Sequence, residues 1–176
     1  METIYLKDYL SNIQRYLNNK NETVIGYADE TCVLSGATTL NEEYCKTNHL
    51  EIYKTHNFGG TIVNFKGDIC VANYQPTFNN FGAEFLIDFK DWLRTKGLNA
   101  ECEGNDVLID NKYKVASFMS QYVNGCLYTA IHISVNMDIE LIKAICTKPM
   151  NKIPKGLTEY GITGKEIDEY VLNYLS

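Results

Sequence analysis

A glycine pair, Gly59-Gly60, followed by Thr61 is the first feature that could take part in chemistry. Glycine lacks a Cβ atom and adopts positive φ angles readily, so backbone N–H groups in such a loop can come close to a ligand. Successive N–H groups of this kind can cradle a phosphate or a thioester carbonyl. A plain tight turn explains the same residues. The pair therefore needs support from other parts of the chain.

The second candidate is Lys114, in an expected strand that follows the pair Asn105-Asp106 and a turn at Asp110 to Lys112. A lysine in a fixed position can stabilise negative charge that develops during a reaction. A solvent-facing hairpin with ordinary polar residues is the alternative. Two histidines lie near these features: His132 is expected to be a structural imidazole, and His56 could contact a phosphate.

The six cysteines are scattered, without a CxxC pair or a cysteine and histidine cluster. Structural zinc sites show ligands in short paired spacings, so no metal site is expected. We expect each cysteine to be a reduced, half-buried small hydrophobic residue. They are Cys32, Cys45, Cys70, Cys102, Cys126 and Cys146.

Composition narrows the classes of function. The 176 residues suit one domain covering 1–176, with a net charge of −6 and no cluster of Lys or Arg, which argues against a nucleic-acid partner. No apolar run approaches the roughly 20 residues that cross a bilayer, so no membrane partner is expected. The amphipathic N-terminus lacks the apolar core of a secretory signal, which predicts a cytoplasmic protein.

Hydrophobic periodicity predicts helices separated by runs of strands. The helices are expected at 4–18, 40–45, 79–96, 137–145 and 164–174. The strands are expected at 23–27, 31–35, 51–54, 61–65, 69–74, 99–103, 106–110, 113–123 and 126–136. Because strands and helices do not alternate regularly, we predict an α+β fold with a largely antiparallel or mixed sheet flanked by helices.

Two of these elements predict where the core lies. Helix 79–96 carries an aromatic stripe that includes Phe85 and Phe89, which is typical of core packing, and Gly97 is expected to end it. In strand 126–136, apolar residues on one side alternate with Tyr128, Ala130, His132 and Ser134 on the other. That alternation predicts a half-buried strand.

Three stretches, in this order, resemble the biotin/lipoate protein ligase and octanoyltransferase family. The first is FGGTIV at 58–63, similar to the family's glycine-rich segment. The second is GNDVLIDNKYKVAS at 104–117, similar to its Asn-Asp pair, strand, turn and Lys-(Val/Ile/Leu)-(Ala/Ser) sequence. The third is NGCLYTAIHISVNMDIELIKAI at 124–145, similar to a strand followed by Met-Asp-Leu at a helix start. Together they cover nearly the whole chain.

The resemblance implies a fold and a site. The fold would be the class II biotin/lipoate ligase catalytic domain, without the accessory C-terminal domain of many lipoate ligases. Lys114 would be the active-site lysine, and Asn105 and Asp106 would contact the nucleotide end of an acyl-adenylate. The remaining substrate-binding residues would be Gly59, Gly60, Thr61, Val115, Ala116 and Ser117. A ligase would use ATP with Mg²⁺, lipoate or octanoate, and a lipoyl or biotinyl carrier domain.

The chain departs from the family pattern at several positions. An Arg-Arg pair of lipoate ligases is replaced by Lys54 and Thr55, and the octanoyltransferase arginine before the glycines by Phe58. The turn at 64–67 lacks the family's His and Pro. Asn124 and Ser134 stand where octanoyltransferases carry arginine and asparagine.

Three functions are therefore open. The first is a lipoate-type ligase that forms an acyl-adenylate and passes the acyl group to a carrier lysine. The second is an octanoyltransferase-like thioester exchange with Cys146 as nucleophile, which requires a thiolate of lowered pKa. The third is a binding or regulatory module that kept the fold without the reaction, because folds outlive functions.

Overall fold

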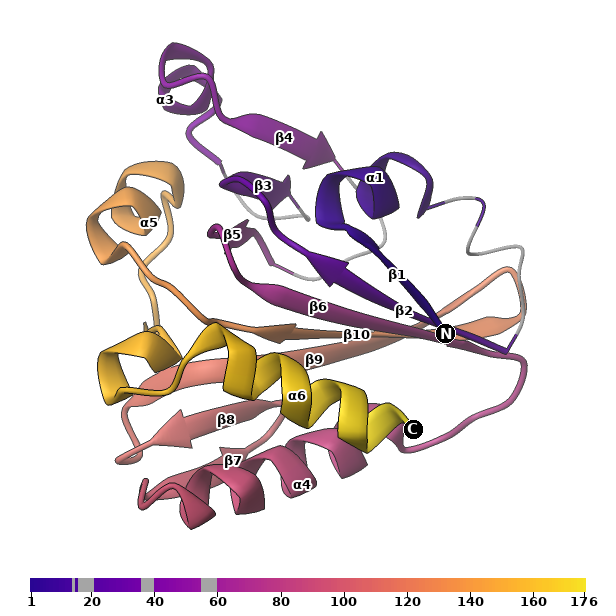
Figure 1. The fold of residues 1–176 in the computed structure, drawn as a ribbon. Helices are drawn as coiled ribbons and strands as arrows, with labels where there is room; N and C mark the ends of the chain where they lie inside the picture. The colour runs from indigo at the N-terminus through magenta and orange to yellow at the C-terminus, as the bar shows by residue number, and fades with distance from the viewer. Residues whose placement is uncertain (14, 16–20, 36–39, 55–59) are drawn as a thin grey trace.

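The computed structural model describes residues 1–13, 15, 21–35, 40–54 and 60–176 (Figure 1). The helices in these ranges are α1 (Leu6–Ser11), α3 (Glu42–Thr47), α4 (Phe81–Thr95), α5 (Ile139–Ile145), the 3₁₀ helix η1 (Leu157–Tyr160) and α6 (Gly164–Leu175). The strands are β1 (Glu2–Tyr5), β2 (Glu22–Tyr27), β3 (Cys32–Ser35), β4 (Glu51–Lys54), β5 (Ile62–Asn64), β6 (Ile69–Gln75), β7 (Ala100–Glu103), β8 (Asp106–Ile109), β9 (Tyr113–Val123), β10 (Cys126–Ile133) and β11 (Ile153–Pro154).

Most strands of the described residues form one large mixed sheet. Its order is β1-β2-β6-β10-β9-β8-β7, with β11 paired to β9. The pairs from β2 to β7 are antiparallel, whereas β1 pairs with β2 and β11 pairs with β9 in parallel. The predicted α+β class with a mixed sheet is confirmed.

The helices α4 and α6 lie together on one face of this sheet (Figure 1). Phe85, Phe89 and Leu93 of α4 are fully buried, together with Ile167 and Val171 of α6 and the facing strand residues. The predicted aromatic stripe is thus core. Gly97 follows the C-terminal end of α4 with a φ of 82°, a backbone conformation that suits glycine.

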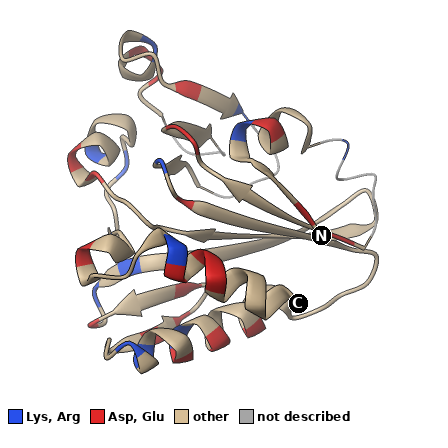
Figure 2. Ribbon diagram, in the orientation of Figure 1, with Lys and Arg blue, Asp and Glu red and all other residues tan. Residues whose placement is uncertain are grey.

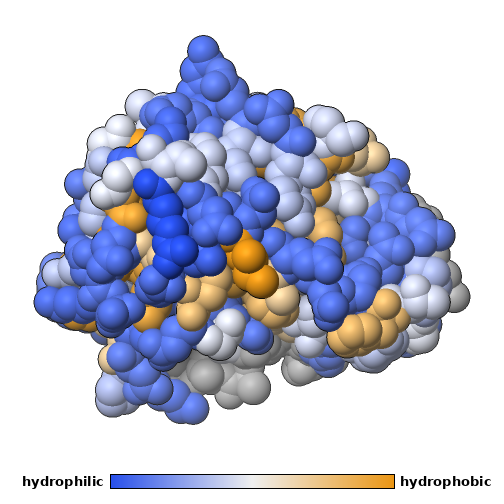
Figure 3. Space-filling view, turned by 90° about the horizontal axis from the view of Figure 1, so that it is seen from below, coloured by the Kyte–Doolittle hydropathy of each residue, from blue (hydrophilic) through white to orange (hydrophobic). Residues whose placement is uncertain are grey.

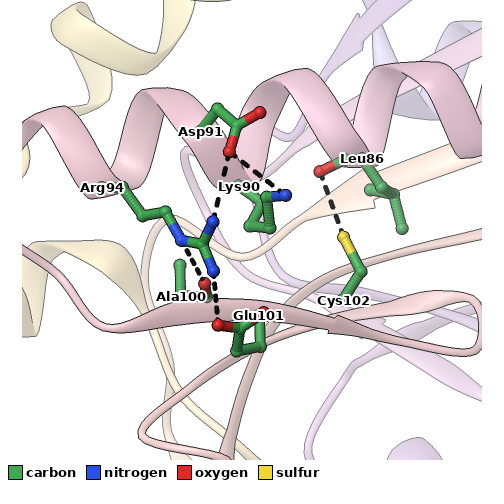
Figure 4. Close-up of polar contacts among 7 residues, drawn as sticks. All are labelled: Leu86, Lys90, Asp91, Arg94, Ala100, Glu101 and Cys102. Atoms are coloured by element: carbon green, nitrogen blue, oxygen red, sulfur yellow. Dashed lines mark hydrogen bonds and ion pairs between the residues drawn. The ribbon is translucent and has the colours of Figure 1, made fainter.

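Polar contacts tie α4 to the edge strand β7 (Figure 4). Arg94 donates from Nε to the carbonyl of Ala100 at 2.9 Å and pairs with Glu101. The thiol of Cys102 donates to the carbonyl of Leu86 at 3.5 Å. Arg94 therefore covers part of an edge that would otherwise offer unpaired backbone groups to another strand.

The outer surface of these helices carries both signs of charge, because basic and acidic residues are interspersed along α4 and α6 (Figure 2). Seen from below, this side of the molecule is largely hydrophilic with small hydrophobic areas between the polar groups (Figure 3). Ile87 of α4 is an exposed hydrophobic residue. Such isolated apolar residues are ordinary on a protein surface.

The opposite face is covered by α1 and by a small sheet of order β4-β3-β5. Leu6, Tyr9 and Leu10 of α1 are buried against strand residues that include Tyr74 and Tyr128. A further apolar cluster joins the small sheet to α3 and α5: Val33, Cys45, Val63, Phe65, Ile142 and Ile145. The large sheet is therefore covered on both faces.

Two expectations about these elements are wrong. The predicted helix at 4–18 begins later, because Glu2–Tyr5 pairs in parallel with β2. It is also interrupted after α1 ends at Ser11, although Ile13 and Arg15 are again helical. The predicted strand 126–136 ends at Ile133 and is not half-buried: Tyr128 and Thr129, on opposite faces, are both buried. Its second face packs under α1 and β3 instead of facing water.

The six cysteines all lie in the described residues and form no disulfide bonds there, and Cys32, Cys45 and Cys126 are buried. Among the described residues, no helix has the length and apolar character needed to span a membrane.

Candidate functional site

A cavity of about 490 Å³ opens between the large sheet, β5, α5 and the segment before β11; we call it the main cavity. A space of about 210 Å³ adjoins it and extends toward α1 and β3; we call it the side arm. Residues that line both are Thr61, Ile62, Asp106, Lys114, Ser117 and His132. Because the two spaces share these lining residues, we treat them as one site with two parts.

The floor of the site is a row of residues from neighbouring strands. Asp106 of β8 lies opposite Ser117 of β9, and Ser117 lies opposite His132 of β10. The row continues to Cys70 of β6. Residues paired across a sheet point to the same face, so this alignment collects a carboxylate, a hydroxyl and an imidazole under the cavity.

A β-bulge in β9 brings Lys114 to the same face as Ser117. Val107 pairs with Ala116 but Leu108 pairs with Lys114, so Val115 is an extra residue on β9. Without the bulge, alternation would place Lys114 and Ser117 on opposite faces. With it, Val115 and Ala116 both enter the core under α4, and Lys114 lines the cavity.

Lys114 meets Asp106 and a second lysine in the main cavity. Lys114 Nζ lies 2.9 Å from Asp106 Oδ1, and Lys152 Nζ lies 2.9 Å from Asp106 Oδ2. Burial raises the pKa of the Asp106 carboxyl, but hydrogen bonds from Lys152 and Lys114 outweigh burial and hold it below the usual 3.8. Burial lowers the pKa of Lys152, but hydrogen bonds to Asp106 and Glu103 outweigh burial and raise it above the usual 10.5. Asp106 and Lys152 therefore both stay charged at neutral pH.

Asp68, which is fully buried, holds His132 in this row. Asp68 Oδ2 accepts from the Phe65 N–H at 2.9 Å and lies 3.2 Å from His132 Nε2. Its Oδ1 accepts from the N–H groups of Val135 and Asn136 at 2.8 and 3.2 Å. One carboxylate thus joins the turn before β6 to the end of β10 and orients the imidazole, which explains the expected structural role of His132.

The side arm is mostly apolar. Its lining includes Leu6, Leu10, Leu34, Met119 and Ala130, contributed by α1, β3, β9 and β10. Such side chains suit an aliphatic chain and offer it no hydrogen bonds.

Two tyrosines add polar atoms to the lining of the side arm. The Tyr9 hydroxyl donates to the Tyr128 hydroxyl at 3.0 Å. Burial raises the pKa of both phenols well above the usual 10, so both remain neutral.

Cys146 also lines the main cavity, where it ends α5. Burial raises the pKa of its thiol above the usual 9.0, and the nearby Cys45 adds to this effect. A thiol in this state supplies little thiolate at neutral pH, which is the form that attacks a thioester.

Only some of the expected site residues line the cavity. Thr61, Asp106, Lys114, Ser117 and Cys146 are brought together in the cavity lining, and Gly60 lines the side arm. Among the rest, Asn105 is exposed on the turn before β8, while Val115 and Ala116 are core residues on the other face. Gly59 and His56, with Thr55 and Phe58, lie outside the described residues. Lys54 pairs with Glu42 at 2.7 Å on the surface.

Two residues of this site, Asp68 and Lys152, were not predicted from the sequence. Asp68 follows Gly67 in a tight turn, where aspartate is common for local reasons, so its type carried no signal. Lys152 stands in a proline-interrupted stretch with no periodicity to place it. Pairing of β11 with β9 is what brings it beside Lys114.

The side chains described here do not form a metal centre, since no group of three His, Cys, Asp or Glu residues among them could hold an ion. The cavity carboxylate of Asp106 is already bonded to two ammonium groups. Mg²⁺ that enters with a nucleotide is held largely by phosphate oxygens. The residues that the structure describes therefore do not fit a resident Mg²⁺ site.

No protein-family model and no curated protein matches the sequence. Solved structures do match. A bipartite lipoate protein ligase from Thermoplasma acidophilum aligns with a TM-score of 0.75 at 15% identity, over 98% of this chain and 80% of that one. The chain has the fold of the biotin/lipoate protein ligase catalytic domain. The fold expected from the three sequence stretches is thus confirmed, since lipoate and biotin protein ligases share it.

Two further structures show how widely the biotin/lipoate ligase fold is shared. LipL1 of P. falciparum, in complex with lipoate, aligns with a TM-score of 0.72 at 15% identity over 98% of this chain. A biotin protein ligase from Aquifex aeolicus, in complex with biotin and ATP, aligns with a TM-score of 0.58 at 16% identity, also over 98% of this chain. The chain spans 60% of the first and 65% of the second.

Proposed function

We propose that the protein is a lipoate-type acyl ligase that joins a short carboxylic acid to a carrier-domain lysine through an acyl-adenylate. The observation that carries this proposal is the two-part lining of the site. An apolar arm suited to an aliphatic tail adjoins a cavity where two lysines face one carboxylate. An acid with an apolar tail and an anionic head matches both parts.

In the first step the acid's carboxylate oxygen would attack the α-phosphorus of ATP. A C(O)O–P bond forms, the Pα–O–Pβ bond breaks, and pyrophosphate leaves. In the second step the neutral amine of a carrier lysine attacks the acyl carbonyl, an amide C–N bond forms, AMP leaves, and the amine proton passes to solvent. Lys114 would contribute a fixed positive charge beside the acyl phosphate in both steps.

The main alternative is thioester exchange through Cys146, because its thiol lines the same cavity as Lys114. The raised pKa of that thiol favours the ligase instead. A third outcome is a module that binds ligand without reacting. Its chief support is that Lys54, Thr55 and Phe58 stand where members of the family carry arginine.

Mass spectrometry of a lipoyl carrier domain separates these functions. The protein is incubated with the carrier and either ATP plus lipoate, ATP plus octanoate, or octanoyl-carrier protein alone. Acylation that requires ATP supports the proposal. Acylation only from octanoyl-carrier protein, lost in Cys146→Ser, supports the exchange. No acylation in any mixture contradicts both reactions.

A further inference from the structure

Asp106 of the main cavity is held between two ammonium groups, one on each of its oxygens. Lys114 takes Oδ1 and Lys152 takes Oδ2, both at 2.9 Å. Lys152 also lies 3.0 Å from Glu103 Oε1 and donates to the Glu103 carbonyl at 3.3 Å. The Asp106 side chain is only 18% exposed, so this cluster belongs to the cavity wall and not to the open surface.

The backbone fixes the position of Lys152. The next two residues, Ile153 and Pro154, form β11 and pair in parallel with Tyr113 and Lys114 of β9. The N–H of Lys155 then donates to the carbonyl of Lys114 at 2.9 Å.

Gly156 secures the end of the segment that carries Lys152. A Cβ atom on Gly156 would lie 2.8 Å from the Val135 carbonyl oxygen, so glycine allows the chain to lie flat against the end of β10. The pairing of β11 with β9 and the close contact of Gly156 with Val135 therefore fix the backbone positions that carry the two lysines.

Two cations facing one carboxylate form an arrangement that an external anion can use. A phosphate group presents pairs of oxygens much as a carboxylate does, and it carries more negative charge. Ammonium groups bind phosphate as point charges with freely rotating donors, so no change of backbone is needed to exchange partners. Asp106 and Glu103 each bring one negative charge to the two lysines, but the Glu103 side chain is 64% exposed, so within the cavity wall two ammonium groups face one carboxylate.

We infer that Lys114 and Lys152 form a two-lysine anion site that binds the phosphate groups of a nucleotide or acyl-adenylate, with Asp106 as the internal anion that holds both lysines in place until the phosphate arrives. Phosphate binding requires Lys152 as much as Lys114. The identity of the anion as a nucleotide phosphate rests on the proposed function, whereas binding of a phosphate anion does not.

Titration calorimetry with inorganic pyrophosphate and with ATP, without acid or carrier, tests this site. A hydrogen bond to a charged group contributes about 1.5–3 kcal/mol, so Lys152→Met should weaken binding of both probes about tenfold or more. Lys165→Met is the matched control: it makes the same change in net charge on α6, where the side chain is 84% exposed, and should leave binding within about twofold. Circular dichroism melting confirms that each variant is folded.

Asp106→Asn gives the decisive contrast. If Asp106 is an internal anion, its removal should strengthen pyrophosphate binding, because the probe no longer competes with a carboxylate. The inference would be overturned by unchanged pyrophosphate binding in folded Lys152→Met. It would also be overturned if Asp106→Asn weakened pyrophosphate binding as strongly as Lys152→Met does. Should Lys152→Met not fold, Lys152→Gln with the same two probes replaces it.

The same variants separate failure of this site from failure of the proposed ligase. Lys152-dependent pyrophosphate binding by a protein that acylates no carrier supports the anion site and contradicts the ligase. Acylation with an unchanged KM for ATP in Lys152→Met supports the ligase and overturns the role of Lys152. If the anion site and the ligase are both correct, Lys152→Met should raise the KM for ATP more than the KM for the acid.

Discussion

The two faces of the large sheet are built from the same strands, but one face packs against aromatic side chains and the other lines a cavity with charged groups. Under α4 and α6, aromatic rings pack on one another, with centroids of Phe85 and Tyr170 at 5.8 Å and of Phe89 and Tyr170 at 5.2 Å. Under β5 and α1, the same sheet presents Asp106, Lys114 and His132 to a cavity. The packed face buries mainly apolar side chains, whereas the cavity face keeps charged groups that are partly exposed.

This difference separates stability from chemistry within single strands. In β9, Val115 and Ala116 serve the packed face while Lys114 and Ser117 serve the cavity. Substitutions on the packed face should therefore act on the free energy of unfolding, and those on the cavity face on binding and rate. Mutations on either face test this separation.

The largest expected effect is on the packed face. Phe85→Ala should lower the free energy of unfolding by about 3–5 kcal/mol, because it removes a fully buried ring and leaves a cavity. Urea denaturation followed by circular dichroism measures the change. Phe78→Ala, at a residue that is 71% exposed, is the matched control and should cost little. Equal losses in the two variants would mean that α4 does not carry the core.

On the cavity face, Lys114→Ala should reduce the proposed ATP-dependent carrier acylation about 10²–10³-fold, as loss of one electrostatic stabiliser does in enzymes. Its free energy of unfolding should change by about 1 kcal/mol or less, because its ion pair with Asp106 is 36% exposed on the lysine side. Single-turnover acylation measured by mass spectrometry gives the rate. Lys165→Ala is the control with the same charge change, and turnover by Lys114→Ala equal to that control would exclude Lys114 from the reaction.

Much of the packed face could be predicted from sequence because periodicity records burial. The aromatic stripe on 79–96 gave α4, and the bounds of β9 were predicted as they are observed. The N-terminal strand β1 was missed since its residues also fit a helical pattern, and only pairing with β2 decides between the two.

The cavity face was harder to predict because its positions depend on irregular or long-range features. Lys114 was predicted as a site residue by resemblance, but regular alternation could not show that a bulge places it on the same face as Ser117. Lys152 and Asp68 enter the site through a parallel pair and a turn contact. Neither contact leaves a periodic signal in the sequence.

Asp68 lies where the two faces meet, so Asp68→Asn should affect both stability and the site. The asparagine amide would present N–H donors to the backbone N–H of Phe65 or of Val135, leaving at least one buried donor unpaired at a cost of about 1–3 kcal/mol. Thermal and urea unfolding measure the loss. Asp138→Asn is the control, because Asp138 caps α5 and asparagine caps helices equally well. Equal stability of the two variants would show that Asp68 does not join β6 to β10.

The smallest expected effect concerns Asp106 and appears only as a dependence on pH. Lys152 and Lys114 lower the pKa of Asp106 in the folded protein despite its burial. Folding therefore favours the ionised carboxylate, and the stability this contributes is complete above the unfolded value of 3.8 and lost as pH falls through the lower folded value. The partners are partly exposed, which limits the contribution to about 1 kcal/mol.

Urea denaturation of wild type and Asp106→Asn across this range tests that sign. Wild type should be the more stable protein at neutral pH, and the difference in free energy of unfolding should shrink as the carboxyl of Asp106 becomes protonated. A difference that stays constant from neutral to acid pH, or that grows in acid, would mean that the two lysines do not hold Asp106 ionised. In that case the cavity face would lack the paired charges that distinguish it from the packed face.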